Sequence, residues 1–354
     1  MTRLLSAALL ALLLAAASPA ASAPLPDTET PTPAWVETLR TRLDAAEARF
    51  PGEIGVYVHH LGRDETFSFR ADENWYLASG VKVPVAIAVL RRIEDGALAL
   101  DSRIALEPDD FVDGAGGTNA HPPGTRLRVS YLLEQMIIYS DNTATDVLIR
   151  VVGLDEVNAV ARELVAAQGL EITTLADVRR RAYGTLHPGA AGLTSADLLA
   201  LRRAAAGAPR LDLLAQMLGT TPGEFLLPDL DSAFEAYYAI NLNSAPLSAY
   251  GRMLGALADG RALGPEQTAY LLGVMERVRT GDRRIRAALP PGARFAHKTG
   301  TQHRRVCDLG IVTLRGERVV IAACARGGTT AQGERALRDV GAAVTASGVL
   351  SPLR

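Results

Sequence analysis

The sequence of 354 residues is almost without lysine, although it is rich in basic residues. Of its 37 basic residues only two are lysine, Lys82 and Lys298, and the others are arginine. A guanidinium group stays protonated in proteins, so arginine supplies charge and hydrogen bonds but cannot accept a proton as a base. Because arginine fills the other basic positions, the two lysines indicate places where an amine is needed.

Cysteine and histidine are also scarce, with two cysteines and six histidines in the chain. The histidines do not have the spacing of metal ligands, and we expect no metal and no other cofactor. In-register pairing across a turn at Gly316 is estimated to place Cys307 and Cys324 diagonally, which fits disulfide geometry poorly. The sequence therefore predicts two buried thiols. Neither cysteine has the surroundings of a nucleophile.

Long apolar runs are limited to one, residues 4–17, which follows the positively charged Arg3. The run is too short to span a bilayer and is followed by small residues, which is typical of a secretory signal peptide rather than an anchoring helix. We predict a signal peptide at 1–23 and one domain at 24–345. The expected location is outside the cytoplasm, periplasmic or secreted, with no membrane span after cleavage.

The charges do not favour one sign, since 37 basic residues face 39 acidic ones in the whole chain. Removing the signal peptide removes only Arg3, so the mature chain keeps a small negative balance. Such a balance argues against nucleic acid or an anionic membrane as the main partner. We expect a monomer that acts on a small substrate.

Strand patterns occur near both ends of the chain and helical patterns between them. The predicted strands are 54–60, 66–70, 295–301, 309–314 and 319–324, and the predicted helices next to them are 33–50, 81–95 and 333–344. This order predicts an α+β fold, with an antiparallel sheet built from both termini, flanking helices and an inserted all-α domain. The α/β part is assigned to 33–95 and 290–345, and the helical part to 96–289.

Ser79 and Lys82 stand where an extended segment gives way to a helix, in Ser79-Gly80-Val81-Lys82. A serine at a helix start lies near free N–H groups and the positive end of the helix dipole, which favour an oxyanion. The lysine follows one turn later on the same face. An amine there can take the serine proton if burial and positive neighbours lower its pKa.

Two further segments combine hydroxyl, amide and ammonium groups. In Ser140-Asp141-Asn142, between two helices, Ser140 can relay a proton and Asn142 can hold substrate, although helix capping alone also explains the triplet. In Lys298-Thr299-Gly300-Thr301, at the end of a strand, the ammonium and hydroxyl groups suit a carboxylate. There we expect Gly300 to let substrate backbone approach, and an N–H near Thr301 to complete an oxyanion hole with that of Ser79.

The three segments together, in this order, resemble the motifs of the class A β-lactamases and their penicillin-binding relatives. The residues around each motif, at 76–84, 139–145 and 281–301, look like family segments as well, so that the resemblance covers about 33–160 and 240–345. It implies the β-lactamase/transpeptidase-like fold, acylation of Ser79, and Ser140 as proton relay. It also implies that Lys298, Thr299 and Thr301 hold the carboxylate of a β-lactam or a cell-wall peptide.

One family residue has no counterpart here. Class A enzymes carry a glutamate, in a loop after the second motif, that activates the water for deacylation. Matching Pro228-x-Leu230-x-x-Ala233 to that loop places Leu227 at this position, whereas matching Thr174-Leu175 places Arg179 there. Neither side chain is a base.

The chain between these two anchors, about 178–226, is predicted to be additional to the family. Glu224, Asp229 and Asp231 are open as substitute bases, although each is better explained as a solvated loop carboxylate. The sequence predicts a serine acyl-enzyme hydrolase that acts on β-lactams with slow deacylation. The alternatives are a D-alanyl-D-alanine peptidase or esterase and a penicillin-binding sensor that acylates without turnover, because one fold hosts several functions.

Overall fold

A computed structural model describes residues 33–165 and 169–352. The predicted signal peptide lies outside the described residues. From Pro33 on, the chain forms a single compact unit. The boundaries predicted inside this unit, at 95/96 and 289/290, remain predictions. Among the described residues, no helix is long and apolar enough to cross a membrane.

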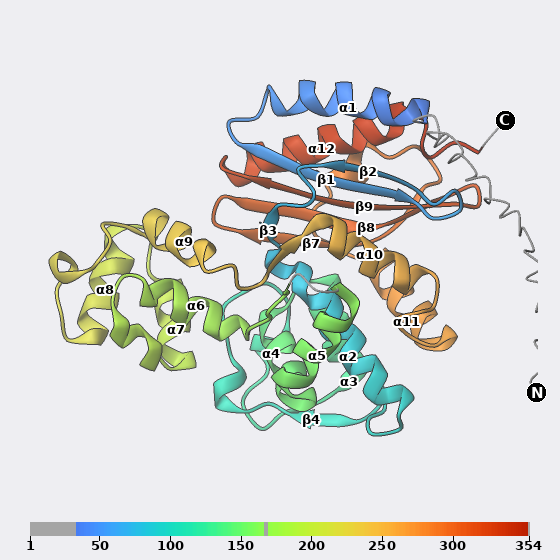
Figure 1. Cartoon of the computed structure of the whole chain (residues 1–354). Helices are drawn as coiled ribbons and strands as arrows, with labels where there is room; N and C mark the ends of the chain where they lie inside the picture. Colours follow the sequence, from blue (N-terminus) through green and yellow to red (C-terminus); the bar gives the residue numbers. More distant parts are fainter. Residues whose placement is uncertain (1–32, 166–168, 353–354) are drawn as a thin grey trace, which may run out of the picture. The chain divides into compact units, whose positions relative to one another are not determined.

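The centre of the unit is a five-stranded sheet in the order β2-β1-β9-β8-β7, in which neighbouring strands are antiparallel. Its strands come from both ends of the chain: β1 Glu53–His60, β2 Glu65–Phe69, β7 Arg294–Gln302, β8 Arg305–Leu314 and β9 Glu317–Arg326. Helices α1 (Ala34–Glu47) and α12 (Thr330–Ser347) cover one face of this sheet (Figure 1). The predicted sheet, built from both termini, is confirmed.

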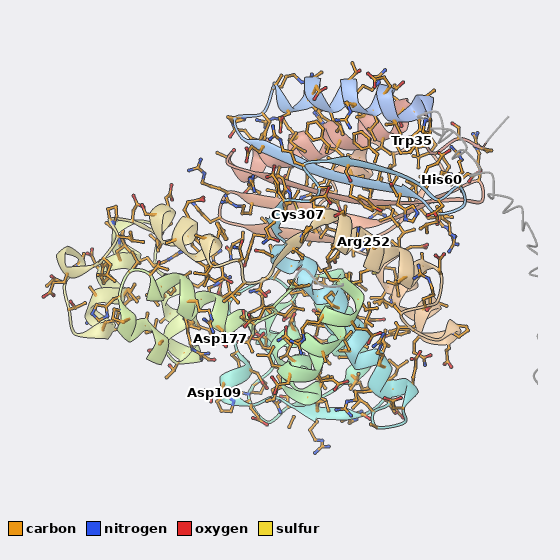
Figure 2. All side chains as sticks on the ribbon, in the orientation of Figure 1. Trp35, His60, Asp109, Asp177, Arg252 and Cys307 are labelled. Atoms are coloured by element: carbon orange, nitrogen blue, oxygen red, sulfur yellow. A yellow bond between two sulfur atoms is a disulfide. The ribbon has the colours of Figure 1, made fainter. Side chains whose placement is uncertain are left out.

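Both faces of the sheet are buried. Since successive side chains on a strand point to opposite faces, one strand contributes to the apolar clusters on both sides. In β1, Val56 and Val58 join the apolar cluster beneath α1 and α12, whereas Tyr57 between them joins the cluster on the other side. Trp35 of α1 lies where that helix meets the sheet (Figure 2). Covering both faces explains why the strands read as nearly continuous apolar runs.

A layer of helices shares one apolar cluster with the second face of the sheet. Its members include α2 Lys82–Glu94, α3 Val129–Ile138, α4 Asn142–Val152, α5 Leu154–Val165, α10 Leu247–Ala258 and α11 Pro265–Glu276. The expectation of a helical middle is confirmed. Two short strand pairs were not expected, β3 (Asn74–Tyr76) with β6 (Ser244–Pro246) and β4 (Arg103–Ala105) with β5 (Arg126–Arg128). Three residues are too few to show strand alternation in a sequence.

A further group of helices has an apolar cluster of its own. The group consists of α6 Leu175–Gly184, α7 Ser195–Arg203, α8 Ala208–Leu218 and α9 Leu230–Ala239. Their cluster also includes Tyr76 and Ala78, and the Tyr76 ring lies 5.8 Å from that of Tyr237 and 4.7 Å from that of Tyr238. This group, which contains most of the predicted additional segment, therefore packs directly against the chain that leads to Ser79.

The prediction of two free thiols is wrong, because Cys307 and Cys324 form a disulfide. The hairpin between β8 and β9 turns on two residues, Arg315 and Gly316, both with positive φ, and this pairs Leu314 with Glu317. Counting back from that pair puts the two cysteines directly opposite each other. The sequence estimate missed the register of this tight turn. Figure 2 shows Cys307 within the sheet.

We expect the disulfide to be complete in the purified protein. Protein unfolded in guanidinium without reductant should show no free thiol, and two after reduction. Because the bond closes a loop with a sequence separation of 17, replacing both cysteines by alanine should lower the free energy of unfolding by about 3 kcal/mol. Urea denaturation of the variant beside oxidised wild type measures this, with reduced wild type as a control. Free thiols in the non-reduced protein would contradict the pairing.

Candidate active site

Ser79 lies in a 3-10 turn, Ala78–Val81, that leads directly into α2. Its neighbour Ala78 has a φ of 48°, in the left-handed region that a residue with a side chain rarely adopts. Such a conformation persists only where the surrounding structure enforces it. The serine is half-buried and lines a pocket whose volume is about 1060 Å³. The predicted position at a helix start is confirmed.

Gly300 of β7 leaves room for the turn that contains Ser79. A Cβ on Gly300 would collide with the carbonyl oxygen of Leu77 and touch the side chain of Ala78. The sequence interpretation assigned this glycine to the approach of substrate. The structure instead shows that its missing side chain leaves space for the segment before Ser79, so that β7 and the serine turn lie against each other.

Lys82 is fully buried, with its amine among polar groups of the second motif. The Nζ atom donates to the Ser140 carbonyl oxygen at 2.7 Å and to Asn142 Oδ1 at 2.7 Å, and it lies 3.4 Å from Ser140 Oγ. Burial lowers the pKa of Lys82 to about 7, against the opposing effect of the Asp141 and Asp146 carboxylates. A sizeable fraction of this amine is therefore neutral near pH 7.

Lys298 approaches the same serine from the sheet. Its Nζ donates to Ser140 Oγ at 2.9 Å and to the Thr299 carbonyl oxygen at 3.0 Å. Burial, together with the positive charges of Lys82 and Arg284, lowers the pKa of Lys298 well below its ordinary value. Both lysines thus meet at Ser140, which itself adopts a left-handed φ of 64° between α3 and α4.

The second motif, Ser140-Asp141-Asn142, both caps helix α4 and contacts the two lysines of the site. Asp141 caps α4 by accepting from Ala144 N, and its second oxygen accepts from Thr118 N. Asn142 accepts from Lys82 and donates through Nδ2 to the Asp113 carbonyl oxygen at 2.6 Å. The capping interpretation is correct for Asp141, while Ser140 and Asn142 face the lysines.

The hydroxyls of the third motif are held by residues that the sequence reasoning missed. Thr299 Oγ1 lies 2.5 Å from Thr280 Oγ1, and Thr301 Oγ1 accepts from Arg284 Nη2 at 2.6 Å. Arg284 is buried and also donates to the carbonyl oxygens of Gly300 and Cys307. In the sequence, Arg284 was noticeable only because it lies in a segment that resembles the family.

Asp146, one turn after Asn142 on α4, is a second residue that sequence reasoning missed. It is buried, and its two oxygens accept from Leu175 N and Ala176 N at the start of α6. Burial raises the pKa of Asp146 to about 7, although these two hydrogen bonds and Lys82 act to lower it. Asp146 lines a neighbouring pocket rather than the one that contains Ser79. Polar side chains are common on helices, so no sequence signal distinguished it.

None of the three substitute bases lies at the serine pocket among the residues described as lining it. Glu224 accepts from Thr221 N, Asp229 caps α9 through Ser232 N, and Asp231 lies 3.0 Å from His303 Nε2. These carboxylates are exposed and serve helix ends or a surface pair.

The two positions matched to the family glutamate differ in their surroundings. Leu227 packs against the apolar cluster of α6–α9. Arg179 lines the serine pocket, where it donates to both oxygens of Asp113 at 2.7 and 3.0 Å. Among the described residues, no group of three or more histidine, cysteine or acidic side chains is arranged to hold a metal ion.

One pocket thus contains Ser79 and Ser140, and two buried amines meet at Ser140, which are groups that acyl transfer needs. Comparisons with known proteins agree, since the model of the β-lactamase enzyme family matches residues 38–347. A β-lactamase of Mycobacterium tuberculosis is 28% identical over 275 residues, which cover 77% of this chain and 72% of that protein. The β-lactamase CTX-M-97 of Escherichia coli is 30% identical over 199 residues, or 54% of this chain and 66% of that protein.

Solved structures show the same similarity. A β-lactamase from Sphaerobacter thermophilus is 27% identical with a TM-score of 0.63, over 89% of this chain and 98% of that one. The structure of PBP-A, at 22% identity and a TM-score of 0.63, covers 88% and 95% of the two chains and shows the shared fold. The chain therefore belongs to the β-lactamase enzyme family, and it is a β-lactamase-like serine hydrolase.

The state of the two amines can be measured directly, because the chain has only two lysines. Lysine labelled with carbon-13 at Cε should give two resonances, assigned with Lys82→Arg and Lys298→Arg. We expect the Lys82 resonance to titrate with a midpoint near pH 7, since burial lowers its pKa to about 7. The Lys298 resonance should also titrate well below pH 10.5. Two midpoints near 10.5 would contradict the burial of the amines.

Proposed function

We propose that this enzyme hydrolyses β-lactams through an acyl-enzyme on Ser79, with Lys82 as the group that takes the serine proton. The observation that carries the proposal is the environment of the Lys82 amine. A neutral amine has two N–H bonds, and its two short contacts are both acceptors, the Ser140 carbonyl and Asn142 Oδ1. Its lone pair is then free to accept a proton from Ser79, one turn earlier in the chain.

The first chemical step follows from this arrangement. Ser79 Oγ attacks the lactam carbonyl carbon while its proton passes to Lys82 Nζ. The backbone N–H groups of Ser79 and Thr301 stabilise the oxyanion. The lactam C–N bond then breaks, and Ser140 Oγ transfers its proton to the leaving nitrogen while it takes the proton held by Lys82 Nζ. Ser140 is suited to this relay because Lys82 and Lys298 both approach its hydroxyl.

The third motif binds the carboxylate of the substrate. Lys298 supplies positive charge, and the hydroxyls of Thr299 and Thr301 donate hydrogen bonds to it. Arg284 adds a buried guanidinium behind Thr301, at 2.6 Å from its hydroxyl. Asn142 holds the acyl side of the substrate on the other side of Ser79. The relatives are named β-lactamases, which favours β-lactam hydrolysis over the peptidase, esterase and sensor alternatives.

The second step, hydrolysis of the Ser79 ester, should be slow. Asp113 is the only acidic residue among the described ones that line the pocket, and Arg179 engages both of its oxygens. A carboxylate with both oxygens engaged by a guanidinium is poorly placed to activate a water molecule. The proposal also includes export behind a signal peptide at 1–23, action as a monomer in the periplasm or medium, and a role in antibiotic resistance.

Variants of the two lysines test the first step. A fluorescent penicillin should label wild-type protein, and Ser79→Ala should not be labelled. Lys82→Arg keeps the charge but removes the base, so the acylation rate should fall by at least about 100-fold. Lys298→Arg should weaken binding and leave slow acylation measurable. Label on the alanine variant, or equal small losses for the two lysine variants, would argue against these assignments.

The lifetime of the acyl-enzyme tests the second step. Mass spectrometry of the protein mixed with benzylpenicillin should show an adduct on Ser79 that lasts minutes or longer, with a burst followed by slow turnover. Leu227→Glu and Arg179→Glu should each shorten the lifetime only if the new carboxylate reaches the ester. Rapid steady-state hydrolysis by the wild type would contradict slow deacylation, and alanine variants of Glu224, Asp229 and Asp231 would then identify the base.

A further inference from the structure

The serine pocket has a second wall that the proposed chemistry does not use. This wall is formed by four arginines from the helices that follow the motif region: Arg179 of α6, Arg202 and Arg203 of α7, and Arg210 of α8. All four fall within 178–226, the segment predicted to be additional to the family. A pocket of about 1060 Å³ that contains both Ser79 and this wall has room for a substrate that reaches beyond a bicyclic β-lactam nucleus.

The wall carries more positive charge than its surroundings neutralise. Asp113 is the one acidic residue among the described residues that line the pocket, and Arg179 already engages both of its oxygens. Arg202 Nε lies 3.7 Å from Asp113 Oδ2, so this single carboxylate is shared. Arg203 and Arg210 form no ion pair within the described part of the chain. Arg210 donates through Nη2 to the Ala204 carbonyl oxygen, and its buried Nε has no partner there.

The wall lies near Asn142, on the side of the site that is proposed to hold the acyl part of the substrate. A series of contacts leads from Lys298 to Ser140 Oγ, from Ser140 to Lys82, and from Lys82 to Asn142 Oδ1. Asn142 continues it to the Asp113 carbonyl oxygen, and the carboxylate of Asp113 meets Arg179 and Arg202. The arginines thus adjoin Asn142, several contacts away from Lys298. A carboxylate bound at the Lys298 end leaves them available to another anionic group.

We propose that the arginine wall is a subsite for a carboxylate on the acyl portion of the substrate, a group separate from the carboxylate bound at Lys298. Guanidinium groups match carboxylates in shape and charge and bind them in pairs of hydrogen bonds. Apolar side chains of the same pocket, Phe111 and Leu199, suit the spacer between the two ends. The preferred substrates are dianionic acyl donors. This inference rests on the proposed acylation of Ser79.

Two penicillins that differ in one group test the subsite. Carbenicillin is benzylpenicillin with an added carboxylate on the side-chain carbon, and the second-order rate constant for acylation of Ser79 is measured for both. Wild type should prefer carbenicillin, and 0.5 M salt should reduce the preference, because screening weakens exposed charge pairs. Arg203→Gln should lower the carbenicillin constant about fivefold more than that for benzylpenicillin, as expected for one partly exposed ion pair.

Control variants separate the effect of a charge in the pocket from the effects of net charge and of altered folding. Arg181→Gln removes an equal charge from α6 at an exposed position that is not among the pocket-lining residues, so the ratio of the two constants should stay that of wild type. Arg210→Gln provides a second variant. Its hydrogen bond to Ala204 means that its melting temperature must be measured beside its kinetics. Equal effects of Arg203→Gln on both penicillins, or the same change of ratio in Arg181→Gln, would overturn the subsite.

A peptide pair distinguishes the source of the carboxylate. The acyl donors are Nα-acetyl-Nε-succinyl-Lys-D-Ala-D-Ala, with a free side-chain carboxylate, and the diacetylated peptide without it. A preference for the succinyl peptide that Arg203→Gln removes would assign the subsite to peptide donors as well. The same preference only among penicillins would assign it to β-lactams. No preference in either pair would overturn the proposal.

Failure of the proposed acylation is recognised separately. If no probe labels Ser79, calorimetry with the Ser79→Ala variant measures binding without chemistry. Tighter binding of carbenicillin than of benzylpenicillin, lost on adding Arg203→Gln, would support the subsite although the proposed function had failed. Equal binding of the two penicillins would overturn the subsite independently of any reaction.

Discussion

The burial of one amine is the constraint on which the arrangement of the site depends. An ammonium group withdrawn from water loses its hydration, and the protein compensates Lys82 with the Ser140 carbonyl and Asn142 Oδ1 rather than with a contacting carboxylate. These partners satisfy the N–H groups without holding the proton firmly. Burial therefore lowers the pKa of Lys82 to about 7, where an amine is both a competent base and a competent acid.

The residues of the candidate site could be predicted from the sequence because the expected chemistry restricts the choice of residue type. A base cannot be arginine, so the two lysines of this arginine-rich chain stood out at Lys82 and Lys298, and the structure brings both to Ser140. The sheet was predictable for a similar reason. Burial on both faces requires apolar runs such as β9 (Glu317–Arg326), which are visible without any alignment.

What the sequence could not predict depends on register or on contacts between distant segments. The disulfide was missed because pairing of Cys307 with Cys324 changes with a shift of one residue at the Arg315–Gly316 turn. The packing of Gly300 against Leu77 was missed because the two residues are far apart in the chain. Arg284 and Asp146 act through hydrogen bonds to distant segments, Arg284 by donating to the third motif and Asp146 by accepting from the start of α6. No local pattern marks such bonds.

The helices α6–α9 cannot be regarded as a separate attachment, because their apolar cluster includes Tyr76 and Ala78 beside the nucleophile. Asp146 connects α4 to the first turn of α6, and Asp113 connects Asn142 to Arg179. The segment is thus held at three points to the elements that position Ser79, Lys82 and Asn142. Ordering a segment that is held so firmly costs conformational entropy. Its four wall arginines line the pocket that contains Ser79. Arg203 and Arg210 form no ion pair in the described part of the chain, so the proposed selection among substrates accounts for their position better than ion pairing does.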